Sequence, residues 1–258
     1  MPRLVFDRRR YGKDNYAYLL AAGDDAALVD PADPVVALGM AAAHGLHPKL
    51  VIHTHGHPDH SGGTAVLRER IGARVLGHAA DRAWFAPDED LAGRAEIVQG
   101  ALRIRVHEVP GHTPGSLLLE WEGRLLTGDT LFWGGCGNCR NGGDPAQLAR
   151  SFLSVFPRLR DTLEVHPGHD YAQANLPFVL DLEPGNPAAA ARLAAVESAR
   201  GAGAEPGAPT LGDERRANPF LRVTDPAVHA AATRRAGAAP HASDEEVFVA
   251  LRRLRDRW

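Results

Sequence analysis

Short apolar runs separated by turns dominate the first two thirds of the chain. Nine of these runs have the alternation or the apolar density of β-strands. They predict strands over Leu4–Phe6, Tyr16–Leu20, Ala26–Asp30, Leu50–Thr54, Arg74–His78, Arg103–Val109, Leu117–Trp121, Arg124–Gly128 and Leu163–His166. Helical spacing predicts helices over Val35–His44, Thr64–Ile71 and Pro145–Phe156. Strands and helices do not alternate strictly, so we expect a mixed fold and not a doubly wound parallel sheet.

The last third of the chain has a different pattern. After about Tyr171 the strand signal fades, and Ala188–Arg200 is rich in alanine with helical spacing. Gly201–Pro209 is a loop rich in Gly and Pro. Ser243–Glu246 forms a capping box ahead of the amphipathic Val247–Arg257. We therefore expect a small helical domain at this end.

Composition narrows the class of protein. With 258 residues, 44% hydrophobic and 24% charged, the chain can bury a core. Its formal net charge of -3 gives no basic surface for nucleic acid, so no such partner is expected. No run approaches the roughly 18 apolar residues that cross a bilayer, and Met1–Asp7 does not begin a signal peptide. We expect a soluble, cytoplasmic protein with no membrane partner, and two cysteines agree with a reducing compartment.

The segment Leu50–Gly63 carries four metal-binding residue types just past an apolar strand. In an extended chain His55 and His57 point the same way and can bind one ion. Asp59 and His60 follow where the chain turns, and can face a second ion. Imidazole and carboxylate ligands suit Zn, Fe or Mn better than Ca. The alternative, a solvated histidine-rich turn, does not account for four such residues in six positions.

Three later segments repeat this context, because each has a candidate ligand at the end of a predicted strand. The candidates are His112 in Gly111–Ser116, Asp129 in Thr127–Phe132 and His169 in His166–Tyr171. Each segment alone is compatible with ordinary turn chemistry. Together, and in this order, the three segments indicate a metal site far more specifically than any one of them does.

Thr54–His60, Gly111–His112, Gly128–Asp129 and Gly168–His169 resemble the metal-binding signature of the metallo-β-lactamase superfamily. Within it the chain is similar to glyoxalase II, the hydroxyacylglutathione hydrolases, nearly from end to end. The segments that carry this second resemblance are Asp14–Leu19, Thr127–Phe132, Gly135–Gly137, Gly168–Tyr171 with Asn175, Glu183–Asn186 and Asn218–Arg222. The resemblance implies an α+β fold, a four-layer αββα sandwich with a C-terminal helical domain. We expect a catalytic domain over 1–172 and a helical substrate-binding domain over 173–258.

The resemblance also implies a dinuclear site. His55, His57 and His112 would hold one metal, Asp59, His60 and His169 the other, and Asp129 would bridge them. We expect two divalent transition metal ions, with Zn first and Fe or Mn as alternatives. Two such ions can share a water and lower its pKa, so that hydroxide reaches a carbonyl carbon. Asp59 and Asp129 are the expected catalytic residues.

The implied reaction is hydrolysis of a small-molecule 2-hydroxyacyl thioester, such as S-D-lactoylglutathione to D-lactate and glutathione in methylglyoxal detoxification. A thiolate leaves without strong protonation, so no Ser-His or Cys-His nucleophile is required. Tyr171, Arg252 and Arg255 match residues that contact glutathione in the family. Asn138 and Arg140 stand where the family has a basic and an aromatic residue, which leaves the thiol carrier open. A monomer or homodimer is expected.

Three alternatives remain at this point. They are a thioesterase for another thiol carrier, a sulfur oxidoreductase like the persulfide dioxygenases, which use one iron, and a non-catalytic binding protein. The intact set of Asp59, His60 and His169 argues against a one-iron oxidoreductase, and retention of all seven expected ligands argues against a non-catalytic protein. Cys136 matches a structural cysteine of the family, and Cys139 suggests a redox-sensitive loop. We expect no metal at His53, His166 or the six remaining histidines: His44, His47, His78, His107, His229 and His241.

Overall fold

The computed structural model describes residues 1–258 and contains two large sheets. The first sheet has six strands in the order β1-β2-β3-β4-β5-β6. Its strands are β1 (Leu4–Tyr11), β2 (Asn15–Ala22), β3 (Asp25–Val29), β4 (Leu50–Ile52), β5 (Arg74–Gly77) and β6 (Glu89–Asp90). The β1-β2-β3 pairs are antiparallel, whereas β3, β4, β5 and β6 run parallel.

The second sheet has five strands in the order β13-β10-β9-β8-β7. Its strands are β7 (Glu96–Gln99), β8 (Leu102–Glu108), β9 (Leu117–Trp121), β10 (Arg124–Gly128) and β13 (Glu164–Pro167). Only the β10–β13 pair is parallel. A small hairpin of β11 (Leu131–Phe132) and β12 (Gly135–Cys136) follows β10 directly.

The sheets pack face to face with helices on the outside, because their central strands are apolar on both faces. In β2, Tyr18 and Leu20 join the core between the sheets, while Leu19 faces the layer of α1 (Pro34–Ala43) and α3 (Thr64–Ile71). In β10, Leu126 joins the core between the sheets, and Leu125 faces the layer of α4 (Pro145–Ser154). These layers form the expected αββα sandwich.

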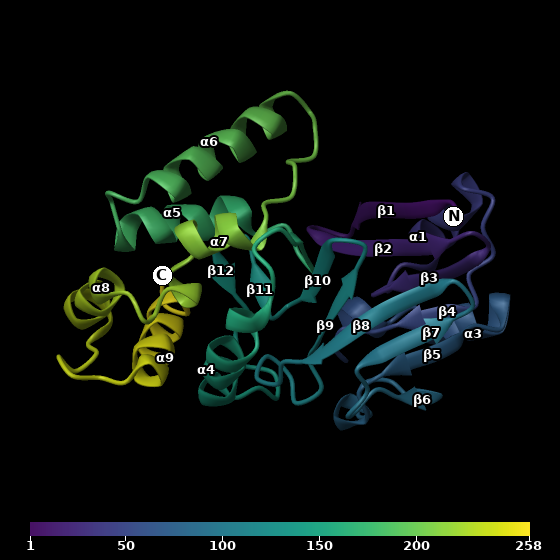
Figure 1. Ribbon diagram of the computed structural model, residues 1–258, viewed down its shortest axis with the longest axis horizontal. Coiled ribbons are helices and arrows are strands. Elements are labelled where there is room, and N and C mark those ends of the chain that lie inside the picture. The colour runs from purple at the N-terminus through teal and green to yellow at the C-terminus, as the bar shows by residue number, and fades with distance from the viewer.

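Five helices follow the last strand. They are α5 (Ala172–Leu182), α6 (Pro187–Gly201), α7 (Leu211–Ala217), α8 (Pro226–Ala236) and α9 (Asp244–Arg255). Figure 1 shows them, in green to yellow, gathered at one side of the sandwich, with α9 beside α4. Their apolar residues share one buried cluster with α4 and the outer face of β10. No helix combines the length and the apolar character needed to cross a membrane.

All nine predicted strands and the five predicted helices are present, with ends that differ from the prediction by at most five residues. Five short elements were not predicted, namely β6, β7, β11, β12 and α2 (Pro58–Ser61). The helices α5, α7 and α8 were not predicted either. Pro177 lies inside α5, and α8 is rich in alanine, so neither has a clear helical period.

The predicted ligands lie at the carboxyl ends of strands. Thr54–His60 follows β4, Asp129 follows β10 and His169 follows β13. The parallel pairs β3–β4 and β10–β13 bring these ends to one edge of the sandwich. Because the two sheets are stacked, loops from both meet at this edge.

Candidate active site

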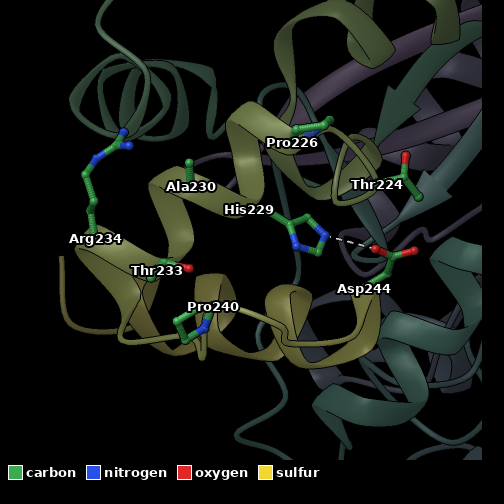
Figure 2. Close-up of a pocket in the computed structure, with 8 residues that line it drawn as sticks. All are labelled: Thr224, Pro226, His229, Ala230, Thr233, Arg234, Pro240 and Asp244. Atoms are coloured by element: carbon green, nitrogen blue, oxygen red, sulfur yellow. Dashed lines mark hydrogen bonds and ion pairs between the residues drawn. The ribbon is translucent and has the colours of Figure 1, made fainter.

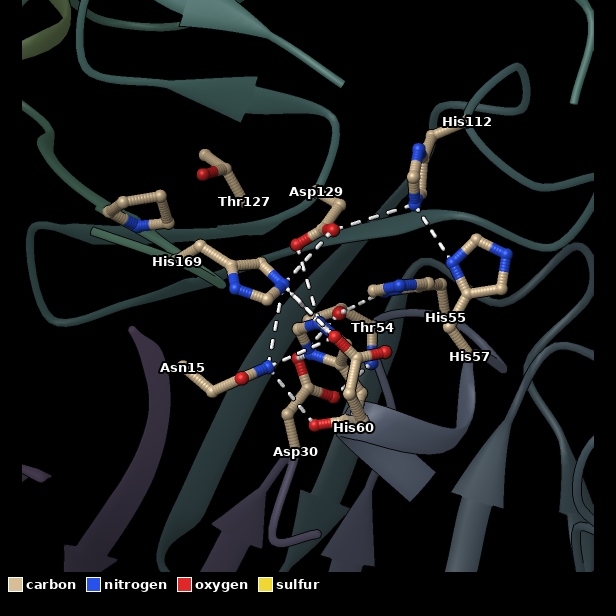
Figure 3. Close-up of polar contacts among 12 residues, drawn as sticks. Asn15, Asp30, Thr54, His55, His57, His60, His112, Thr127, Asp129 and His169 are labelled. Carbon is tan, nitrogen blue, oxygen red and sulfur yellow. Dashed lines mark hydrogen bonds and ion pairs between the residues drawn. The ribbon is translucent and has the colours of Figure 1, made fainter. Parts of the chain in front are cut away.

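Three histidines form the first ligand set. The ring nitrogens of His55, His57 and His112 lie within 4.8 Å of one another, and all three side chains are buried. Nδ1 of His57 and Nε2 of His112 are 3.0 Å apart. Nε2 of His55 is buried and has no hydrogen-bond partner. The structure therefore brings these three predicted ligands together, as Figure 3 shows.

The second set consists of Asp59, His60 and His169, which also have their ligand atoms within 4.8 Å. Nε2 of His169 lies 3.2 Å from both Oδ2 of Asp59 and Nε2 of His60. His60 and His169 are buried, whereas Asp59 faces solvent. The most exposed member of the site is thus a carboxylate.

Asp129 lies between the two sets (Figure 3). Its Oδ2 is 3.5 Å from Nε2 of His112 and 3.4 Å from Nε2 of His169, and its Oδ1 is 3.4 Å from Nε2 of His60. Oδ1 is buried without a hydrogen-bond partner. The carboxylate therefore occupies the position that a bridging ligand requires.

The donor set fits divalent metals. Nδ1 of His112 donates to the Asn138 carbonyl, and Nε2 of His57 donates to the Asn141 carbonyl. In this tautomer Nδ1 of His57 and Nε2 of His112 carry lone pairs that point toward each other. Two facing lone pairs repel, so this arrangement is favourable only with a cation between them. Together with the unpartnered atoms of His55 and Asp129, the arrangement implies two divalent metals.

Carboxylate charge concentrates around the second set. Burial alone lowers the pKa of an imidazole, but the negative charges of Asp129 and Asp30 raise the pKa of His60 to about 10. The pKa of His169 rises to about 11 against the same effect of burial, chiefly because of Asp129. Both histidines therefore lie in a field that attracts cations.

Asp30 belongs to the site, although it is not among the site residues predicted from the sequence. Its carboxylate accepts hydrogen bonds from the Thr54 hydroxyl at 2.6 Å and the Thr54 N–H at 2.8 Å, and lies 3.2 Å from Nδ1 of His60. The Thr54 hydroxyl lies 3.1 Å from Nδ1 of His55. Asp30 also falls within ligand distance of His55 and His60, but its oxygens are engaged by these donors. It orients one histidine of each set, as carboxylates beside metal sites do.

Asp14 and Asp81 were missed as well. Oδ1 of Asp14 lies 2.8 Å from Nδ1 of His169. Asp81 is fully buried and accepts from the Gly56 N–H and the Thr113 hydroxyl, so it joins the loops that carry His57 and His112. For Asp30 a signal was available, because it is a carboxylate directly after a strand at the same sheet edge.

The residues predicted to bind substrate surround a polar cavity of about 310 Å³. Its lining includes Tyr171, Asn138, Arg140, Arg252 and Arg255, together with Phe132, Cys136, Asn175, Asp256 and Trp258. The ring of Tyr171 stacks on that of His169, with centroids 4.8 Å apart, which connects the cavity to the second ligand set.

The two arginines of α9 have different surroundings. Arg252 is 6% exposed and donates to the Cys136 carbonyl at 2.7 Å and to Asp256 at 3.1 Å. Arg255 is only half-buried and makes one polar contact, a 3.2 Å hydrogen bond to Asn175. Arg255 is therefore the freer cation of the pair.

The remaining predictions concern cysteines and other histidines. Burial raises the pKa of Cys136 to about 11 and that of Cys139 to about 12, so both thiols stay protonated at neutral pH. This weighs against a redox-sensitive loop. His53 is buried and bonded to Thr64, and neither it nor His166 belongs to a cluster of potential ligands.

A larger cavity of about 610 Å³ lies against α8 and is also lined by Thr224, Pro240 and Asp244 (Figure 2). Its ionisable pair is His229 and Asp244, 2.9 Å apart and both partly exposed. None of its lining residues belongs to either ligand set. Its size exceeds that of the cavity at Tyr171, but its chemistry does not mark it as the reactive centre.

Comparison with known families agrees with this geometry. Residues 10–169 match the metallo-beta-lactamase superfamily, and residues 170–258 match the hydroxyacylglutathione hydrolase C-terminus. A hydroxyacylglutathione hydrolase of Anaeromyxobacter dehalogenans is 65% identical over 98% of this chain and 100% of its own. The hydroxyacylglutathione hydrolase of Dechloromonas aromatica is 38% identical over 95% of this chain and 96% of its own.

Solved structures agree on the fold. ETHE1 from Myxococcus xanthus has a TM-score of 0.66 and 26% identity, covering 95% of this chain and 88% of its own. A protein solved in a di-iron-bound form has a TM-score of 0.58 and 27% identity, covering 83% of this chain and 100% of its own. The two ligand sets, the αββα sandwich and the full-length match to a relative at 65% identity lead to one conclusion. The chain belongs to the hydroxyacylglutathione hydrolase family of the metallo-β-lactamase superfamily.

Proposed function

We propose that this protein is a dinuclear thioester hydrolase that converts S-D-lactoylglutathione to D-lactate and glutathione. The observation that carries the proposal is the meeting of two complete ligand sets at Asp129, next to a cationic cavity at Tyr171. The 65% identical relative is named for this activity. We divide the chain into a catalytic part, 1–172, and a substrate-binding part, 173–258.

His55, His57 and His112 would hold one metal, and Asp59, His60 and His169 the other, with Asp129 shared. Two divalent metals bound there would lower the pKa of water and polarise a carbonyl. Zinc is our first assignment because imidazole-rich sites of this kind suit it, with Mn as an alternative. Iron is the other alternative, since one solved relative is in a di-iron-bound form.

The chain's own residues have distinct tasks in this proposal. Asp59 is the member of the ligand sets with access to bulk water, so it is suited to exchange the proton of the attacking water. Water oxygen bonds to the carbonyl carbon, the C–S bond breaks, and the thiolate leaves with the electron pair. A thiol pKa of about 8.5 makes this departure easy without a protonating side chain.

Arg255 supplies a cation for a carboxylate of glutathione, and Tyr171 supplies an aromatic wall between that cation and His169. Arg140 adds a further cation to the same cavity, and Asn138 an amide. Glutathione carries two carboxylates, so a cavity with three arginines and one aspartate suits it. Cytoplasmic location and a monomeric or homodimeric state remain predictions.

The test is turnover of one acyl group on different thiols. We expect S-D-lactoylglutathione to be hydrolysed with a higher kcat/KM than D-lactoyl thioesters of γ-glutamylcysteine, which lacks the glycine carboxylate, and of coenzyme A. Equal rates on all three would leave only a general thioesterase. Oxygen uptake with persulfide substrates and no thioester turnover would instead support the sulfur oxidoreductase.

A further inference from the structure

The segment Gly137–Gly143, here the Asn138 loop, is fixed at both ends against backbone that carries ligands. The Gly137 N–H donates to the Thr130 carbonyl at 3.2 Å, and the Asp144 N–H donates to the Gly111 carbonyl at 2.8 Å. A Cβ at position 137 would lie 2.0 Å from the Asp129 carbonyl oxygen. A Cβ at position 143 would lie 2.3 Å from the Gly111 carbonyl oxygen. The loop therefore packs directly on the segments of Asp129 and His112.

Two carbonyls of this loop point inward, although the side chains of their residues are exposed. The Asn138 carbonyl accepts from Nδ1 of His112 at 2.6 Å, and the Asn141 carbonyl accepts from Nε2 of His57 at 3.0 Å. The opposite nitrogens of these two rings are the ones that face each other in the first set. The tautomer and direction of two of its three imidazoles thus depend on the shape of one loop.

The two imidazoles of the second set are supported by side chains and not by loop carbonyls. Asp30 lies against Nδ1 of His60 and Asp14 against Nδ1 of His169. Both supports are carboxylate side chains, and neither belongs to the Asn138 loop. A change in the carbonyls of that loop should therefore affect the first metal position more than the second.

The shape of the loop depends on its own side chains. Oδ1 of Asn138 accepts a 3.0 Å hydrogen bond from the Arg140 N–H, closing a local turn. The Arg140 guanidinium donates to the Asp256 carbonyl at 2.6 Å and lies 3.6 Å from the Asp256 carboxylate. Asn138, Arg140 and Asp256 also line the 310 Å³ cavity. The same loop is thus a wall of that cavity and a support for the first ligand set.

We propose that the Asn138 loop is a positioning device that couples the thiol cavity to the first metal position, with the Asn138 side chain as the residue that sets its shape. Asn138 acts through the loop carbonyls and does not touch the reacting atoms. The coupling to a ligand rests on the proposed function, whereas the support of the first metal position does not.

The first test follows metal release from the zinc-loaded protein into an excess of a chromophoric chelator, with no thioester present. We expect two phases, one of which disappears in His112→Ala. Asn138→Ala should accelerate that phase by about tenfold to a hundredfold, because the ring support is loosened. Asn138→Asp keeps the accepting oxygen and should restore the wild-type rate. Arg253→Ala, an exposed change on α9 outside the cavity, is the matched control.

Three results would overturn the positioning role. They are unchanged release from Asn138→Ala, equal acceleration of both phases, and a failure of Asn138→Asp to restore the rate. The second result would mean a general loosening of the site, and the third would mean that the accepting oxygen is not the cause.

The second test adds S-methylglutathione, a stable thioether, to the same assay. The ligand should slow the phase assigned to the first metal position in the wild type and in Arg253→Ala, but not in Arg140→Ala. No effect on the wild type would refute the coupling. Lactoylglutathione turnover is measured separately, so loss of the proposed function with an intact Asn138→Ala effect would leave the positioning role standing.

Discussion

Oδ1 of Asp14 lies 2.8 Å from Nδ1 of His169, although 155 positions separate the two residues in the chain. Asp14 is in the turn between β1 and β2, and His169 follows the last strand. The neighbouring Tyr16 N–H donates to the Gly168 carbonyl at 2.8 Å, so the two segments are held together by backbone as well. The first hairpin therefore fixes the last ligand of the second set.

Removal of the Asp14 carboxylate should weaken the binding of metal by His169. We expect Asp14→Ala to lower the metal content at the second position and to reduce kcat/KM by about 10- to 100-fold, because ring orientation and basicity are lost. Asp14→Asn retains an acceptor and should lose less. Metal analysis and thioester turnover check this, with the exposed Asp24→Ala as control. Wild-type metal content and rate in Asp14→Ala would show that the contact is dispensable.

The Asp129 carboxylate lies within 3.5 Å of histidines of both ligand sets, so its removal should affect both metals. Purified wild-type protein should contain close to two transition metals per chain, and Asp129→Ala should lose at least one. Thioester hydrolysis should fall by at least about a hundredfold, since charge stabilisation at the reacting carbonyl is lost. Full activity in a protein with one tightly bound ion would contradict the dinuclear site.

Gly168 leaves no space for a side chain. A Cβ there would lie 2.4 Å from Oδ1 of Asp129 and 2.6 Å from Cε1 of His60. Gly168→Ala should therefore displace the bridging carboxylate and reduce metal content and activity, while the circular dichroism spectrum stays that of the folded protein. Gly185→Ala, where a Cβ meets nothing within 4 Å, is the matched control. Equal metal content in both variants would mean that the site adapts to the added methyl group.

Substitution of Arg252 should mainly lower stability, whereas substitution of Arg255 should mainly lower the affinity for substrate. Arg252→Ala removes buried hydrogen bonds to Cys136 and Asp256, and should lower the free energy of unfolding by about 2 kcal/mol. Arg255→Ala should mainly raise KM for lactoylglutathione, about ten- to a hundredfold, because a remote carboxylate is bound alike in ground and transition states. Urea denaturation and steady-state kinetics check the pair. An unchanged KM in Arg255→Ala would remove this residue from glutathione recognition.

Glu214 should make stability depend on pH. It is buried, and burial raises its pKa to about 7, above the 4.5 of a free glutamate, despite hydrogen bonds from the Gly134 N–H and Asn218 and the nearby charge of Arg192. Between pH 4.5 and 7 the folded state binds more protons than the unfolded state. Stability should thus fall as pH rises through this window, by an amount on the order of 3 kcal/mol.

Glu214→Gln should remove this slope, so the variant gains stability relative to the wild type between pH 5 and pH 8. Urea denaturation at both pH values measures the difference, and contributions from bound metal cancel in the comparison. Glu197→Gln, an exposed change on α6, should track the wild type. Parallel pH dependence of Glu214→Gln and wild type would show that Glu214 is ionised throughout.

The sequence predicts the architecture, because apolar strand patterns are local features, and the seven residues expected to bind metal come together because each follows the end of a strand. It does not predict supports such as Asp14, whose partner is brought near only by tertiary folding. The Asn138 and Asn141 contacts use backbone carbonyls, which every residue has, so no side-chain pattern can reveal them. The family resemblance assigns Arg252 to the substrate, but in the folded protein its guanidinium donates hydrogen bonds to Cys136 and Asp256.

Strand β13 is the last strand of the chain and pairs in parallel with β10, from which it is separated by α4. Until residues 164–167 have been synthesised, β10 is paired on one side only and presents an open row of backbone donors and acceptors. Parallel pairing across such a long connection is slow, because loop closure precedes any gain from contact. A nascent chain of this protein therefore exposes the edge of β10 to aggregation until β13 has been synthesised and has paired with it.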